Sequence, residues 1–133
     1  MFRQLLGFAA DRLQRLGAEC SRRAKLWWER SREPDKNEER GLNLLREWLS
    51  PQQLAQYDAR KYFDVIGSQS GRRYRIYHGT AANVREIDGA GRPRDGWCFV
   101  PDARLVAGDV MLAQKIALET DERRALSVAR SFL

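Results

Sequence analysis

The sequence predicts an α+β protein. The order is a long N-terminal amphipathic helix, two short helices, a three- to four-stranded antiparallel meander, and one or two C-terminal helices packed on one face of the sheet. Three observations support this order. Apolar residues first recur at helical spacing, then alternate at strand spacing from about residue 62, and finally return to helical spacing. Strands that are grouped together and flanked by helices are typical of α+β folds.

The first 32 residues are expected to form one basic amphipathic helix. Its apolar stripe consists of residues three or four positions apart, namely Phe2, Leu6, Ala9, Leu13, Leu16, Cys20, Ala24 and Trp27, widened by Leu5 and Trp28. The segment holds eight basic residues against three acids, a surplus of five in a chain of net charge +6. A helix of this length extends about 45 Å, farther than a small body can cover. Part of the stripe is therefore expected to contact another partner.

A polar break follows the N-terminal segment. Residues 33–37 include Pro34 and are interpreted as a linker between the appendage, residues 1–32, and a small α+β domain, residues 38–133. About 100 residues are enough to bury a core. The first helix of this domain is expected over residues 38–49, where leucines recur at helical spacing.

The next helix, expected over residues 51–60, carries the clearest local signal. Ser50 can accept hydrogen bonds from the exposed N–H groups of the first turn, and Gln53 completes a capping box with it. Pro51 suits the first helical position because its missing N–H would have no partner there.

From Tyr62 onward the apolar period changes to that of strands. Glycine-containing turns at residues 67–71 and 89–93 separate the strands. The four strands are expected at residues 63–66, 74–77, 83–87 and 97–100. After them, Asp109 is expected to cap a helix over residues 110–119, and residues 122–132 are expected to continue that helix or to form another.

Catalytic and metal motifs are weak in this sequence. His78 is the only histidine, and it could act as a base with Cys98, Ser68 or Ser70 as the nucleophile. A lone histidine at a strand end is more often a surface residue, so no catalytic residue is predicted. Two cysteines and one histidine cannot supply the four ligands of a structural zinc site. We therefore expect no metal, no cofactor and no small-molecule substrate.

Localisation is predicted from the cysteines and from the apolar runs. Cys20 and Cys98 lie far apart in different expected elements, which favours reduced thiols. The apolar run of residues 5–10 is too short for a membrane span or for the core of a secretory signal. These features indicate a cytoplasmic protein, with attachment to a membrane surface as an alternative.

One strand suggests a nucleic-acid site. Strand alternation places Tyr74 and Ile76 on one face, and Arg73, Arg75 and Tyr77 on the other. A sheet face with arginine beside tyrosine can hold phosphates and stack bases. The alternative is a solvated face on which a cross-strand pair, Arg75 with Asp64, satisfies the charge.

The favoured function is a non-enzymatic protein-binding module or accessory subunit that docks through its N-terminal helix, either onto another protein or onto a second copy. Leu6, Leu13, Leu16 and Trp27 would enter an apolar groove, with Trp28 beside them. Arg12, Arg15 and Arg22 would steer the approach to an acidic surface. The alternatives are nucleic-acid binding through the basic helix and the arginine–tyrosine face, and membrane-surface binding in which the two tryptophans anchor at the headgroups.

Two resemblances add expectations. The extended segment FDVIGSQSGRRYRIY, the strand WCFVP and the helix that ends at Glu119 resemble a SWIM module. That family binds zinc through a CxC…CxH set, of which only Cys98 is present here. Val100 occupies the position of the second cysteine, and Gly108–Met111 holds no Cys-x-His, so the resemblance implies a metal-free relative.

The strings YFDVIGS, GRRYRI, GWCFVP and GDVMLAQKIALE resemble those of a family of small uncharacterised proteins of alphaproteobacteria. This resemblance covers residues 41–129 and implies no particular activity. It implies that these residues form the reusable unit and that the N-terminal helix is a variable addition.

Overall fold

The computed structural model describes residues 21–26, 35–99 and 105–132. The chain divides into two compact units, Met1–Asp35 and Lys36–Leu133. In the first unit, residues 21–26 are helical and exposed. The remainder of the helix expected over residues 1–32 lies outside the described residues.

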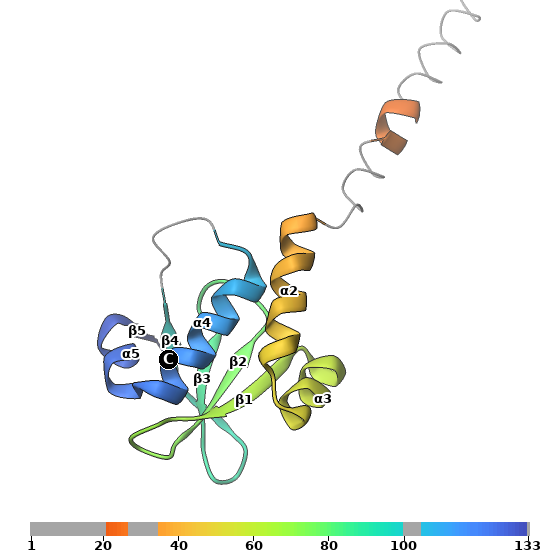
Figure 1. The fold of residues 1–133 in the computed structure, drawn as a ribbon. Coiled ribbons are helices and arrows are strands. Elements are labelled where there is room, and N and C mark those ends of the chain that lie inside the picture. The colour runs from red at the N-terminus through yellow and green to blue at the C-terminus, as the bar shows by residue number, and fades with distance from the viewer. Residues whose placement is uncertain (1–20, 27–34, 100–104, 133) are drawn as a thin grey trace, which may run out of the picture. The chain divides into compact units, whose positions relative to one another are not determined.

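The second unit is α+β, as predicted (Figure 1). A five-stranded sheet has the order β1-β2-β3-β4-β5, and each neighbouring pair is antiparallel. In chain order the elements are α2 (Lys36–Trp48), α3 (Pro51–Arg60), β1 (Tyr62–Ile66), β2 (Arg73–Tyr77), β3 (Val84–Ile87), β4 (Pro93–Cys98), α4 (Ala107–Thr120), α5 (Glu122–Val128) and β5 (Arg130–Phe132).

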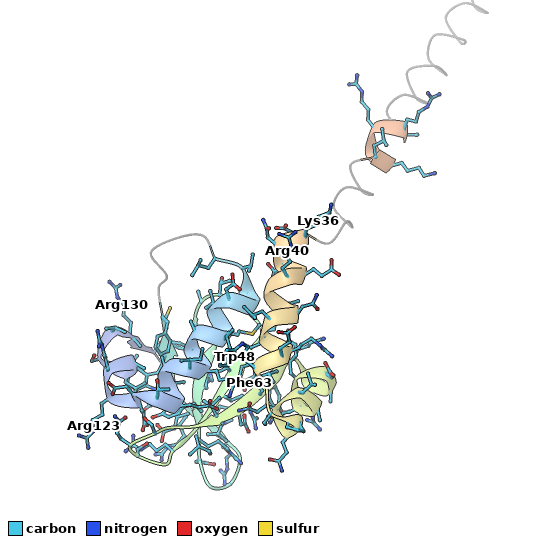
Figure 2. The ribbon with its side chains drawn as sticks, in the orientation of Figure 1. Lys36, Arg40, Trp48, Phe63, Arg123 and Arg130 are labelled. Carbon is cyan, nitrogen blue, oxygen red and sulfur yellow. The ribbon has the colours of Figure 1, made fainter. Side chains whose placement is uncertain are left out.

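The helices cover one face of the sheet. Helix α4 packs on β1 and β2, α2 and α5 pack against α4, and α3 lies along β1 (Figure 1). The core lies between these layers, and Phe63 marks its position in Figure 2. The largest fully buried side chains are Tyr74, Phe63, Leu45, Ile76, Met111, Leu118, Val65 and Val84. Tyr74 and Ile76 thus share the buried face, as the alternation predicted.

Helices α2 and α4 approach closely at two glycines. Gly41 and Gly108 are both buried, and the backbone of one helix contacts the backbone of the other at this point. This approach brings Glu38 of α2 to the start of α4, where its Oε1 accepts a hydrogen bond from the backbone N–H of Ala107 at 3.3 Å.

The prediction that Asp109 caps a helix beginning at Val110 is wrong. Helix α4 begins at Ala107 rather than at Val110, and Asp109 lies in its first turn instead of capping it. Val106 is the N-cap residue, and its side chain makes no capping hydrogen bond. Glu38, which is 69 positions away in the sequence, supplies an acceptor for an N–H group at this helix end. A local sequence pattern does not contain this partner.

The capping box at α3 is confirmed. The Ser50 Oγ accepts a hydrogen bond from the Gln53 backbone N–H at 3.2 Å, and the Gln53 Oε1 accepts one from the Ser50 backbone N–H at 3.0 Å. Both helix bounds agree with the prediction, Pro51 to Arg60.

The C-terminal region differs from the expectation in two ways. The fourth strand covers Pro93–Cys98 instead of residues 97–100. The helix that begins at Glu122 ends at Val128, and Arg130–Phe132 forms a fifth strand, where a helix to residue 132 had been expected. This strand pairs with β4 through Gly96, Trp97 and Cys98.

A buried carboxylate fixes the loop between β1 and β2. Glu122, which is 2% exposed, accepts hydrogen bonds from the backbone N–H groups of Gln69 and Ser70 and from the hydroxyls of Ser70 and Tyr74. Burial alone would raise the pKa of Glu122, but these hydrogen bonds outweigh it and hold the pKa below its ordinary value. The carboxylate therefore joins α5 to the loop.

Candidate functional site

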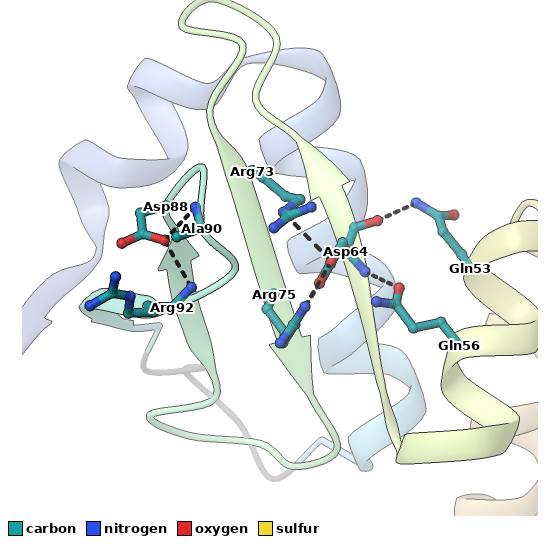
Figure 3. Close-up of polar contacts among 8 residues, drawn as sticks. All are labelled: Gln53, Gln56, Asp64, Arg73, Arg75, Asp88, Ala90 and Arg92. Atoms are coloured by element: carbon teal, nitrogen blue, oxygen red, sulfur yellow. Dashed lines mark hydrogen bonds and ion pairs between the residues drawn. The ribbon is translucent and has the colours of Figure 1, made fainter.

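The predicted arginine–tyrosine face lies on the side of the sheet opposite the helices. Asp64 on β1 is directly across from Arg75 on β2. Arg75 donates from Nε to Asp64 Oδ1 at 2.8 Å and from Nη2 to Oδ2 at 3.1 Å (Figure 3). The Arg73 Nε is 3.8 Å from Oδ2 of the same carboxylate. The cross-strand pair considered as an alternative in the sequence analysis is thus present.

The electrostatics of this face follow from that pair. Burial alone would raise the pKa of Asp64, but the hydrogen bond and charge of Arg75 bring the pKa below its usual range. The hydrogen bond to Asp64 in turn raises the pKa of Arg75. The carboxylate and the guanidinium therefore remain charged and paired at neutral pH.

The aromatic rings of this face are also engaged. The Arg75 guanidinium carbon lies 4.1 Å from the centroid of the Tyr62 ring, within cation–π distance. Tyr62 and Tyr77 meet edge to face, with centroids 5.4 Å apart. Arg75 covers one face of Tyr62, and Tyr62 contacts Tyr77. Arg75 and Tyr77 therefore belong to one network of contacts on this face.

Asp64 is positioned by a neighbouring helix. The Gln53 Nε2 of α3 donates to the Asp64 carbonyl oxygen at 2.9 Å, and the Gln56 Oε1 accepts from the Asp64 backbone N–H at 2.8 Å (Figure 3). Both glutamines thus bind the backbone of β1 on the side away from β2. Sequence reasoning missed this contact.

Three of the four groups considered for catalysis, His78, Ser68 and Ser70, have hydrogen-bond partners within the fold. The Nδ1 of His78 is 2.9 Å from the hydroxyl of Tyr57, whose pKa is raised by burial. Ser70 Oγ donates to Glu122, and Ser68 Oγ accepts from the Glu122 backbone N–H. Cys98 is a partly buried free thiol. Among the described residues, no group of three His, Cys, Asp or Glu side chains could hold a metal ion.

An apolar hollow of about 270 Å³ lies between α4 and α5. Among the described residues, its lining consists of Phe99, Leu105, Val110, Ala113, Gln114, Ala117, Ala125 and Val128. Val128 is 74% exposed and Leu105 is 46% exposed, so large apolar side chains reach solvent here. The α4 residues of the lining recur at helical spacing, which is the signal that could have revealed this surface.

Gln114, the polar residue of the described lining, is hydrogen-bonded within the protein. Gln114 and Asn83 are buried and exchange two side-chain amide hydrogen bonds, each of 2.9 Å. The pair occupies one N–H donor and the carbonyl oxygen of Gln114, so this side chain is already engaged within the protein. The hollow is therefore apolar in its chemistry.

Most of the predicted docking residues fall outside the described part of the chain. These are Leu6, Arg12, Leu13, Arg15, Leu16, Trp27 and Trp28. Arg22 is described, and it is helical and exposed. In the described ranges, no helix combines the length and the apolar character that crossing a membrane requires. No family model matches the chain, and neither a curated protein nor a solved structure matches it.

Proposed function

We propose that this chain is a non-enzymatic protein-binding module. The observation that carries the proposal is the apolar hollow between α4 and α5, with Val128 and Leu105 exposed at it. Solvent-exposed apolar side chains around a concave surface are typical of contact sites for partner proteins. A partner's apolar side chain, presented by an amphipathic segment, is the occupant that we propose.

The chemistry of the hollow favours this occupant over a substrate. Its volume of about 270 Å³ is close to the lower bound of roughly 300 Å³ for small-molecule sites, so the polar groups of the lining decide between the two. Such sites also present convergent polar groups, whereas Gln114 is already paired with Asn83. Covering a large apolar side chain such as that of Val128 stabilises a complex by about 1.5–3 kcal/mol.

The N-terminal segment supplies a second contact in this proposal. Residues 1–32 would form an amphipathic helix that docks in an apolar groove of the partner through Leu13 and Leu16. Arg12, Arg15 and Arg22 would steer the approach, so reversing their charges should slow association, while exchanging the two leucines for serine should abolish docking.

The test compares full-length variants in affinity capture, followed by binding measurements with each recovered protein. Val128→Asp places a charge in the hollow, and Ser127→Asp is the matched control on an exposed residue that does not line it. We expect to recover a protein that binds the Ser127→Asp variant but not the Val128→Asp variant. Nuclease treatment should not change this result. Equal binding of that partner to both variants would contradict a role for the hollow.

Two further arms separate the rival functions. Recovery of nucleic acid alone, with an affinity that falls steeply with salt, would support the basic helix and the arginine–tyrosine face instead. Binding to anionic vesicles with a blue-shifted tryptophan emission would support the membrane-surface alternative.

A further inference from the structure

A second hollow lies where the β1–β2 loop approaches the β3–β4 turn. It has a volume of about 450 Å³, and three arginines contribute to its lining, Arg72, Arg73 and Arg94. The rest of the lining consists of Gly71, Glu86, Ile87, Asp88 and Gly89. Arg72 and Arg94 are exposed, so guanidinium groups are accessible from solvent.

Arg73, which lines this hollow, has an unmet hydrogen-bonding need at its Nε. Arg75 already donates to both carboxylate oxygens of Asp64, at 2.8 and 3.1 Å. The Arg73 Nε reaches the same carboxylate only at 3.8 Å, which is too long for a hydrogen bond. This Nε is buried and has no hydrogen-bond partner within the described residues. One carboxylate thus serves two guanidinium groups, and Arg73 is the one left unsatisfied.

The two acids of the lining are engaged. Asp88 Oδ1 accepts hydrogen bonds from the backbone N–H groups of Ala90 and Arg92, at 2.9 and 2.8 Å, and so holds the turn (Figure 3). Glu86 lies 3.8 Å from the Nε of Arg72. Arg94 makes no ion pair with any residue that the structure describes. The lining therefore carries three guanidinium groups against two carboxylates, a surplus of one positive charge, and Arg94 lies outside the ion pairs that Arg72 and Arg73 form.

We infer that this hollow binds a phosphate group, held by Arg73 and Arg94 with Arg72 at its side. A guanidinium is planar and presents paired N–H donors that match phosphate oxygens. A bound phosphate would give the Arg73 Nε the acceptor that it lacks. This site is separate from the apolar hollow and does not depend on the proposed protein-binding role.

The test uses inorganic phosphate as the probe and the full chain at low ionic strength. In ¹⁵N-detected NMR, the Arg73 Nε–H resonance should shift and saturate on titration with phosphate, whereas acetate at matched ionic strength should leave it in place. Arg73→Gln and Arg94→Gln should each weaken binding about tenfold or more, as expected for losing a hydrogen bond between charged groups. Arg60→Gln, at an exposed position on α3, should bind like the wild type.

Arg73→Lys keeps the charge but lacks the planar pair of donors, so its affinity should fall between those of wild type and Arg73→Gln. An Arg73 resonance that does not respond to phosphate, or an equal response to acetate, would overturn the inference. A 5′-phosphorylated oligonucleotide, compared with its unphosphorylated form, then distinguishes a terminal phosphate from the phosphodiester backbone as the source.

Discussion

Gly108 of α4 crosses Gly41 of α2 so closely that a Cβ built on Gly108 would lie 2.1 Å from the Gly41 carbonyl carbon. The atoms in its way are backbone atoms, which cannot turn aside as a flexible side chain can. A larger residue at position 108 therefore has to push the two helices apart.

Gly108→Ala is expected to destabilise the fold by about 3 kcal/mol, near the upper end for overpacking a core. Urea unfolding would measure the change in the free energy of unfolding. Gly89→Ala is the matched control, because a Cβ there meets no atom within 4 Å. We expect that control to stay within about 0.5 kcal/mol of the wild type. Similar stabilities for the two variants would contradict the close helix approach.

The fold should lose stability in acid through Glu122. The hydrogen bonds to this carboxylate hold its folded-state pKa below the ordinary value of 4.5. A carboxylate with a lowered folded-state pKa contributes stability that is fully present above its unfolded-state pKa. That contribution is lost as the pH falls through the folded-state pKa. Unfolding free energies at about pH 7 and about pH 3.5 should therefore differ more in the wild type than in Glu122→Gln.

Glu122→Gln should also destabilise the protein by about 2 kcal/mol at neutral pH, because charged hydrogen bonds become neutral ones and one acceptor becomes a donor. The new N–H₂ group would face the donors Ser70 and Tyr74. An unchanged pH dependence in this variant would show that other carboxylates dominate the acid transition.

Two ion pairs should differ clearly in how much they contribute to the free energy of unfolding. Asp64→Asn leaves the partly buried Arg75 without its carboxylate and should cost about 2–3 kcal/mol. Asp58→Asn removes an exposed pair with Arg46 and should cost at most about 1 kcal/mol. Thermal unfolding of both variants, at low and high salt, would test the difference. Equal losses would mean that burial adds nothing to the Asp64 pair.

Ser50→Ala is expected to cost about 1 kcal/mol by removing the capping hydrogen bond of α3. Ser127→Ala serves as the control, since its hydroxyl donates to the carbonyl oxygen of Arg124 within the same helix and does not cap a helix start. Chemical denaturation of both variants would show whether the loss is specific to the helix start.

The elements that were predicted correctly are those whose signals are local. The capping box of Ser50 and Gln53 defines α3 within a few residues, and glycines bound the hairpin of β1 and β2. The alternation along β2 is also a local signal. It correctly placed Tyr74 and Arg75 on opposite faces of the sheet, and the face of Tyr74 is the buried one.

The errors arise where the partner is distant in the sequence. Strand β5 is three residues long and takes its hydrogen bonds from β4, so no local pattern distinguishes Arg130–Phe132 from the end of a helix. The start of α4 depends on Glu38 in another helix. The apolar hollow likewise requires α4 and α5 to meet before its lining exists.

The two glutamines that bind the backbone of Asp64 have a further consequence. An outermost strand offers unpaired N–H and C=O groups on which another molecule can template intermolecular β-sheet, the first step of aggregation. The side-chain amides of Gln53 and Gln56 hydrogen-bond to the C=O and the N–H of Asp64, the middle residue of β1. They take the place of the peptide groups that a neighbouring strand would provide. An incoming strand would have to displace two hydrogen bonds before forming its own, which protects the chain from self-templated association at this edge.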